Sequence, residues 1–151
     1  MLRDDINKDL AAALKARNER AVSTLRMINA ALKNADVEAR GQGRPPLGEA
    51  EVLALLQKMI KQRQESVELY KKGGRADLVK QEEEEIAIIS AYLPKQMSEA
   101  EVAAAIDAAV REVGATAMKD MGRVVGVLRV KYAGRMDMAK ASALVKARLS
   151  A

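Results

Sequence analysis

The stretch MKDMGRVVGVLRVKYAGRMD, residues Met118 to Asp137, decides how the C-terminal part of the chain folds. It is typical of an amphipathic helix, a tight stop and the start of a second helix. Asp120 is a residue type that caps helix N-termini. Gly134 stands where a helix commonly ends in a left-handed turn. The sequence therefore predicts two helices joined at Gly134.

Gly122 and Gly126 are four residues apart, so they share one face of the first of these helices. A glycine inside a helix costs roughly 1 kcal/mol relative to alanine, so two of them require a compensating interaction. Close packing against a neighbouring helix would supply it. Helix packing is the more common reason for such glycines, and a partner whose backbone approaches the bare surface is the alternative that the sequence leaves open.

Positive charge is concentrated in the same part of the chain. The net charge is +5. Residues 119–151 hold eight Lys or Arg against two acids, whereas residues 1–118 hold eighteen against nineteen. The excess therefore belongs to the last fifth of the sequence. Such asymmetry favours a polyanionic partner, nucleic acid first, although a basic solvated face would give the same composition.

Hydrophobic periodicity predicts four helices in the first 93 residues. A turn near Asn18 separates the first two helices, and the loop 41–48, with its glycines and paired prolines, precedes the third. The third helix is expected over 49–72 and the fourth over 77–92. The residues expected on the buried sides of the first three are Leu2, Ile6, Leu10 and Leu14; Val22, Leu25, Ile28 and Leu32; and Val52, Leu56, Met59, Val67 and Tyr70.

Two charged features interrupt this pattern. Arg63 falls within the apolar series of the third helix. Glu82 to Glu85 are four successive carboxylates, which spread around a helix and cannot all converge on one metal ion or substrate. We expect them to form a solvated acidic face.

Pro94 marks the expected domain boundary, because it disfavours helical angles at Leu93. Ser98 and Glu101 then form a capping box that opens a fifth helix, which is expected to stop at Gly114. The sequence thus predicts an all-α protein with an N-terminal domain of about four helices, residues 1–93, and a C-terminal three-helix bundle, residues 94–151. The residues expected on the buried sides of the fifth and last helices are Val102, Ile106, Val110 and Val113; and Met138, Leu144, Val145 and Leu149.

Several kinds of chemistry lack their usual residues. The chain has no histidine and no cysteine, which removes the commonest general base, the commonest metal ligand and any disulfide. No glycine-rich nucleotide loop is present. We therefore expect no catalytic residue, no metal site and no cofactor. No apolar run is long enough to cross a membrane, and the N-terminus MLRDDINKDL has acidic residues where a signal peptide would be apolar. We therefore expect no membrane association and a cytoplasmic location.

Three short motifs and the C-terminal glycines resemble the stand-alone YqeY-like proteins. The motifs are Lys61–Ser66 (KQRQES), Gly74–Leu78 (GRADL) and Tyr92–Gln96 (YLPKQ), and the glycines are Gly122, Gly126 and Gly134. The resemblance extends over essentially the whole chain. It implies a relationship to the C-terminal helical and tail region of the B subunit (GatB) of the tRNA-dependent amidotransferase, where the tail bundle contacts tRNA outside the catalytic centre.

The resemblance implies a non-catalytic tRNA-binding or tRNA-linked accessory protein, because the catalytic cradle of that subunit precedes its tail. The positions that match the family tail are Gly122, Gly126, Gly134 and Arg135. The basic residues of the same stretch, Lys119, Arg123, Arg129 and Lys131, complete the set that we expect to bind tRNA. Two alternatives stay open. One is a protein-interaction module for an amidotransferase or an aminoacyl-tRNA synthetase. The other is a component of a carbon–nitrogen ligase that uses glutamine as amido-N-donor within a complex.

Overall fold

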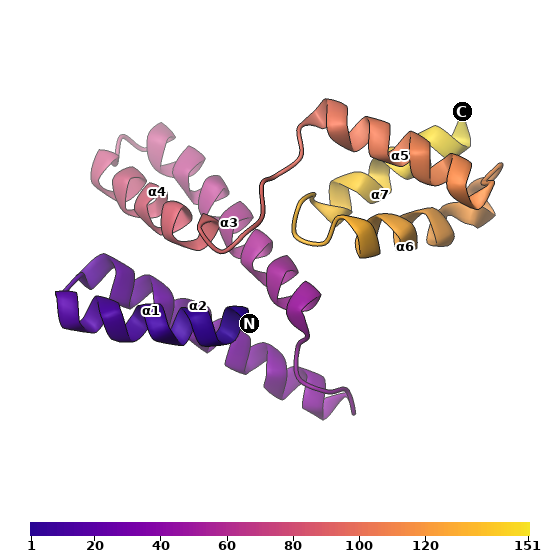
Figure 1. The fold of residues 1–151 in the computed structure, drawn as a ribbon. Coiled ribbons are helices and arrows are strands. Elements are labelled where there is room, and N and C mark those ends of the chain that lie inside the picture. The colour runs from indigo at the N-terminus through magenta and orange to yellow at the C-terminus, as the bar shows by residue number, and fades with distance from the viewer. The chain divides into compact units, whose positions relative to one another are not determined.

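The computed structural model describes all 151 residues, Met1–Ala151, and contains seven α-helices, one short 3₁₀ helix and no strand. The predicted all-α fold class is therefore confirmed. The chain divides into two compact units, Met1–Leu93 and Pro94–Ala151 (Figure 1). The first unit contains α1 (Leu2–Ala16), α2 (Glu19–Gly41), α3 (Glu49–Lys72) and α4 (Ala76–Ser90); the second contains α5 (Glu99–Val113), η1 (Met118–Asp120), α6 (Met121–Lys131) and α7 (Met138–Ser150).

The N-terminal unit consists of two helical hairpins. α1 packs against α2, α3 packs against α4 over the most extensive contact, and α2 also touches both α3 and α4. Asn18 begins α2, because its side-chain oxygen accepts a hydrogen bond from the backbone N–H of Ala21 at 3.1 Å. The shared core of the two hairpins is formed by Ile6, Ala13, Leu25, Ile28, Leu32, Val52, Leu56, Met59 and Ile89.

Two leucines that were expected to be buried lie at the surface. Leu14 is 48 % exposed, near the end of α1, and Leu144 is 49 % exposed on α7. In α7 the inward positions are taken by Ala141 and Val145. Leu144 directly precedes Val145 and is therefore rotated about 100° away from it. The helical period identified the helices correctly but placed these two side chains wrongly.

The expected acidic face on α4 is wrong at Glu85, which is only 4 % exposed. Its Oε2 lies 3.1 Å from Nε of Arg63, the residue that interrupts the apolar side of α3. Arg63 also donates to the backbone carbonyl of Met59 at 3.1 Å. Arg20 on α2 donates to neighbouring Glu84 at 3.1 Å. The acidic run therefore joins three helices, because a guanidinium inside the unit needs a carboxylate beside it.

The C-terminal unit is a three-helix bundle in which α5, α6 and α7 all contact one another. Ser98 and Glu101 form the predicted capping box, with hydrogen bonds of 3.1 and 3.2 Å. Gly114 ends α5 with φ +64°, a conformation that glycine adopts without strain. The core is formed by Ala105, Ile106, Ala109, Val110, Val124, Val125, Leu128, Met136, Ala141 and Val145.

The segment 94–97 is bound to the turn between α6 and α7. The N–H of Met97 donates to the carbonyl of Arg135 at 2.9 Å. The side-chain amide of Gln96 donates to the carbonyl of Gly134 at 2.6 Å. Arg135 in turn donates from Nε to the carbonyl of Lys95 at 3.1 Å. These four residues thus belong to the C-terminal unit, although no helix includes them.

Independent folding of the C-terminal unit stays a prediction, and these contacts sharpen it. A fragment of residues 94–151 should show helical circular dichroism and a cooperative thermal transition. A fragment of residues 98–151 should melt at a lower temperature, because it lacks the three hydrogen bonds to the 134–135 turn, each worth about 1 kcal/mol. The prediction would be contradicted if the 94–151 fragment showed no cooperative transition, or if the 94–151 and 98–151 fragments had equal melting temperatures.

A second prediction concerns the buried ion pair of the N-terminal unit. Glu85→Gln should lower the free energy of unfolding by about 3 kcal/mol, because it leaves the guanidinium of Arg63 without its charged partner. Glu83→Gln is the matched control: Glu83 belongs to the same acidic run but is exposed, and its replacement should change stability by no more than about 0.5 kcal/mol. Urea unfolding of both variants measures the difference, and equal stabilities would refute the role of Glu85.

Candidate nucleic-acid interface

The predicted basic helix corresponds to α6 and the 3₁₀ helix η1 that leads into it. Val124, Val125 and Leu128 are buried on its inner side. Gly122, Lys119 and Arg129 are exposed. The helix therefore has one side in the core and one side in solvent, as the amphipathic pattern indicates.

Asp120 positions the start of this helix in a way that the sequence did not indicate. Its side chain does not cap α6. Instead, Oδ2 accepts hydrogen bonds from the backbone N–H groups of Thr116 at 3.0 Å and Ala117 at 3.2 Å, which precede it. Oδ1 accepts a third hydrogen bond, from Nη2 of Arg123 at 2.8 Å. This buried carboxylate holds the turn between α5 and α6 in place.

The hydrogen bonds from Thr116 and Arg123 hold the pKa of Asp120 at about 2, below its ordinary value of 3.8. These donors stabilise the charged form of the carboxylate. At neutral pH Asp120 is therefore a fixed negative charge beneath the exposed side of the helix. It partly neutralises Arg123, whose side chain is nevertheless 60 % exposed.

The two glycines of α6 face open space. A Cβ atom built on Gly122 or on Gly126 would meet no atom within 4 Å outside the local helix backbone. Close packing against a neighbouring helix, one of the two explanations for these glycines, is therefore wrong within the C-terminal unit. Within the C-terminal unit no side chain packs against the surface they form.

We call the solvent side of this helix the bare face of α6: Lys119, Gly122, Arg123, Gly126, Arg129 and Val130. Arg129 and Val130 follow Gly126 by three and four residues, which places them on its side of the helix. Lys119 and Arg129 have no ion-pair or hydrogen-bond partner in the structure. Val130 is 83 % exposed, and periodicity alone did not single out this apolar side chain.

The other sequence-predicted site residues lie elsewhere. Lys131 forms an ion pair with Glu112 of α5 at 2.7 Å, and this hydrogen bond raises the pKa of the lysine. Gly134 adopts φ +76° in the turn after α6, and Arg135 is engaged with the carbonyl of Lys95. These three residues therefore have structural partners, and the structure does not bring them together with the bare face.

The structure gathers no cluster of three acidic side chains suited to a metal ion. None of its helices combines the length and the apolar character needed to cross a membrane. Fold and surface together define an all-α protein of two helical units, one of which exposes a basic helix face.

Comparison with known proteins identifies the family. A family model described as "Yqey-like protein" matches residues 3–149. The chain belongs to the YqeY-like family, which confirms the resemblance found in the sequence motifs.

Curated relatives include two fungal proteins named "Altered inheritance of mitochondria protein 41, mitochondrial". The relative from Lachancea thermotolerans is 35 % identical over 72 % of this chain and 58 % of its own length. The relative from Eremothecium gossypii is 33 % identical over 74 % of this chain and 60 % of its own length. An uncharacterised protein of Schizosaccharomyces pombe is 30 % identical over 62 % of this chain and 72 % of its own length. The chain thus spans less than two thirds of the first two relatives, whose names state no binding partner.

The pKa of Asp120 leads to a test of its role. Because this pKa is lower in the folded state, the carboxylate stabilises the fold above about pH 4, and the stabilisation disappears as the pH falls towards 2. Asp120→Asn should therefore melt below the unmodified chain at pH 7, and the two melting curves should converge near pH 2. Asp107→Asn is the control, because Asp107 forms an exposed ion pair of little energetic weight. A difference for Asp120→Asn that persists at pH 2 would contradict this explanation.

Proposed function

We propose that this chain is a non-catalytic accessory protein that binds folded RNA, tRNA first, through the bare face of α6. The observation that carries the proposal is the open glycine pair with unpaired cations beside it. Lysine and arginine supply most contacts to nucleic-acid phosphates. Lys119 and Arg129 would make such contacts without first breaking an ion pair.

The bare surface of Gly122 and Gly126 supports a close approach. Without side chains at these positions, a sugar–phosphate backbone can lie against the helix backbone between the cationic side chains. Arg123 adds a third positive group, which Asp120 holds in a fixed orientation. The excess positive charge of the C-terminal part of the chain would steer a polyanion towards this unit.

The tyrosines favour a folded RNA over a single strand. Single-strand binding relies on exposed aromatic rings on which bases stack. Here Tyr132 packs against the core of the C-terminal unit, Tyr92 donates a hydrogen bond to Asp9, and Tyr70 is half-buried. Recognition by shape and phosphate position, the usual mode for double-helical RNA, requires no such rings.

A protein-interaction module is the second candidate, and Val130 is the observation that favours it. An apolar side chain that is 83 % exposed beside two bare glycines also suits a helix of a partner protein, such as an amidotransferase or an aminoacyl-tRNA synthetase. Binding of that kind depends on apolar area and persists at high salt, whereas phosphate binding weakens steeply with salt.

A component of a glutamine-dependent carbon–nitrogen ligase is the third candidate, supported by the family relationship alone. Amide transfer that requires this chain in a reconstituted mixture would favour it. The cytoplasmic location stays a prediction, and the names of the two fungal relatives point instead to mitochondria.

The RNA proposal predicts a charge effect that is specific to the bare face. Lys119→Gln/Arg129→Gln should weaken binding to purified tRNA. It should also reduce the slope of log K against log salt by about one unit for each phosphate that the variant no longer binds. Lys140→Gln/Lys146→Gln is the matched control, since it removes two exposed, unpaired cations of α7 and the same net charge. Fluorescence anisotropy at several salt concentrations, with duplex DNA as competitor, provides the measurement.

Gly126→Ala separates binding from folding. An added methyl group meets nothing within 4 Å and improves helix propensity, so the melting temperature should stay constant or rise. Binding to tRNA should nevertheless fall if the RNA backbone approaches the glycines. If Lys119→Gln/Arg129→Gln binds tRNA with unchanged affinity and salt slope, the RNA proposal fails and the protein-interaction candidate takes its place.

A further inference from the structure

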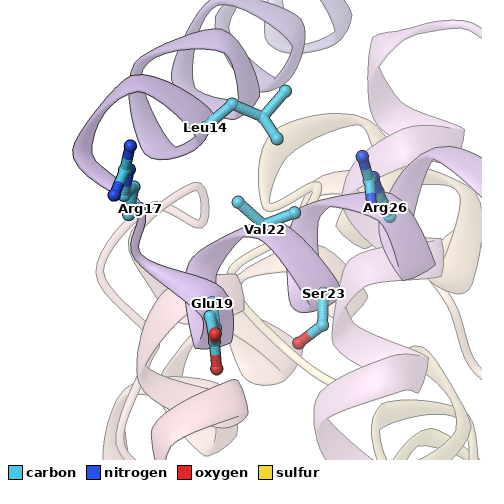
Figure 2. Close-up of a pocket in the computed structure, with 6 residues that line it drawn as sticks. All are labelled: Leu14, Arg17, Glu19, Val22, Ser23 and Arg26. Carbon is cyan, nitrogen blue, oxygen red and sulfur yellow. The ribbon is translucent and has the colours of Figure 1, made fainter.

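A hollow lies at the bend between α1 and α2, outside the interactions described so far. It is lined by Leu14, Arg17, Glu19, Val22, Ser23 and Arg26 (Figure 2). Leu14 and Val22 face each other across it, and the side chains of Arg17 and Arg26 lie on either side of this apolar pair. Glu19 and Ser23 extend away from the arginines. The hollow thus combines an apolar floor with a basic rim.

Five of the eight arginines of the N-terminal unit form an ion pair, and of the three that do not, Arg17 and Arg26 line the hollow whereas Arg40 does not. Arg3, Arg20, Arg44, Arg63 and Arg75 each form an ion pair there. Arg17 and Arg26 have no ion-pair or hydrogen-bond partner for their guanidinium groups. Two unpaired guanidinium groups beside one hollow therefore remain free to bind carboxylates, which match their planar donor geometry.

The backbone conformation of Arg17 also sets this residue apart from the other arginines of the unit. Arg17 is the only residue other than glycine with a positive φ, 55°, where asparagine or glycine would be less strained. Its backbone N–H ends α1 by bonding to the carbonyl of Leu14 at 3.3 Å. The fold needs this backbone turn but makes no use of the long cationic side chain. The side chain is therefore available for binding.

We propose that this hollow docks an acidic segment of a partner protein, in which a leucine-like side chain lies next to one or more carboxylates. The aliphatic side chain covers Leu14, which is 48 % exposed, and Val22. The carboxylates bind Arg17 and Arg26. Both parts of the occupant follow from the lining, one from its apolar floor and one from the charge complementarity of its rim.

The open shape of the hollow favours a protein segment over a small amphiphile. Small ligands bind in pockets that bury most of their surface. Here five of the six lining residues are exposed, so a small molecule would stay largely in water. A peptide chain gains further contact by continuing along the helices beyond the hollow.

Methyl NMR of the full chain tests the proposal with defined probes. The acidic peptide acetyl-Glu-Leu-Glu-Glu-Leu-amide should shift the methyl signals of Leu14 and Val22 in a saturable manner. The same peptide with glutamine for glutamate, or with serine for leucine, should bind at least tenfold more weakly. The first comparison isolates the charge and the second isolates the apolar contact.

Variants of the protein complete the test. Arg17→Asn/Arg26→Gln should lose at least tenfold in affinity for the acidic peptide. Asparagine tolerates the left-handed backbone at position 17, so the melting temperature should not fall. Lys33→Gln/Lys58→Gln, which removes two exposed and unpaired cations of the same unit, should bind like the unmodified chain. Absence of shifts at Leu14 and Val22, equal binding by the arginine variant or the serine peptide, or equally tight binding of octanoate would overturn the proposal.

Discussion

The buried carboxylate of Asp120 is the contact on which the candidate interface depends. α5 ends at Gly114, and within six residues the chain must enter α6 with its apolar side turned towards α5 and α7. Asp120 controls this passage by accepting the N–H groups of Thr116 and Ala117, so that helix α6 begins at Met121. Once that starting point is set, the helical repeat places Val124 and Leu128 in the core and leaves Gly122 and Gly126 on the side where no side chain packs against them.

The glycines of the C-terminal unit fall into two physical classes. Gly114 and Gly134 have positive φ angles, which other residues adopt only with strain, so the backbone explains them. Gly122 and Gly126 lie within α6, have open space around them and reduce the propensity of the helix to form. Folding gives no reason for the second class. The external contact that we propose would give one, because it needs a smooth helix surface, and the adjacent unpaired cations suit a partner of negative charge.

Local signals made much of the fold predictable. The bounds of α3 agree with those expected, and Asn18 and Ser98 begin helices where their side chains can bind free N–H groups. Contacts between side chains of different helices could not be predicted from the sequence. The run Glu82–Glu85 looked solvated because periodicity does not show which residue of another helix lies opposite, and Arg63 lies opposite Glu85. Arg135 was assigned to RNA for a similar reason, since its hydrogen bond to Lys95 joins positions forty residues apart.

The motifs that identify the family can be explained largely by structural roles. Arg63 of the first motif forms the buried ion pair with Glu85, and Gly74 of the second adopts φ +70° between α3 and α4. In the third motif, Tyr92 donates a hydrogen bond to Asp9 of α1. These contacts give all three residues a structural role, so none of them by itself indicates what the protein binds. No such structural role is seen for the bare glycines of α6, for the unpaired cations beside them, or for the two arginines at the α1–α2 hollow. Exposed, unpaired cations such as Lys33 and Lys140 also occur elsewhere on the chain, so unpaired charge alone does not mark a site. What distinguishes these two places is bare helix backbone beside the cations in one and an apolar floor between them in the other, and these are the places where we propose that partners be sought.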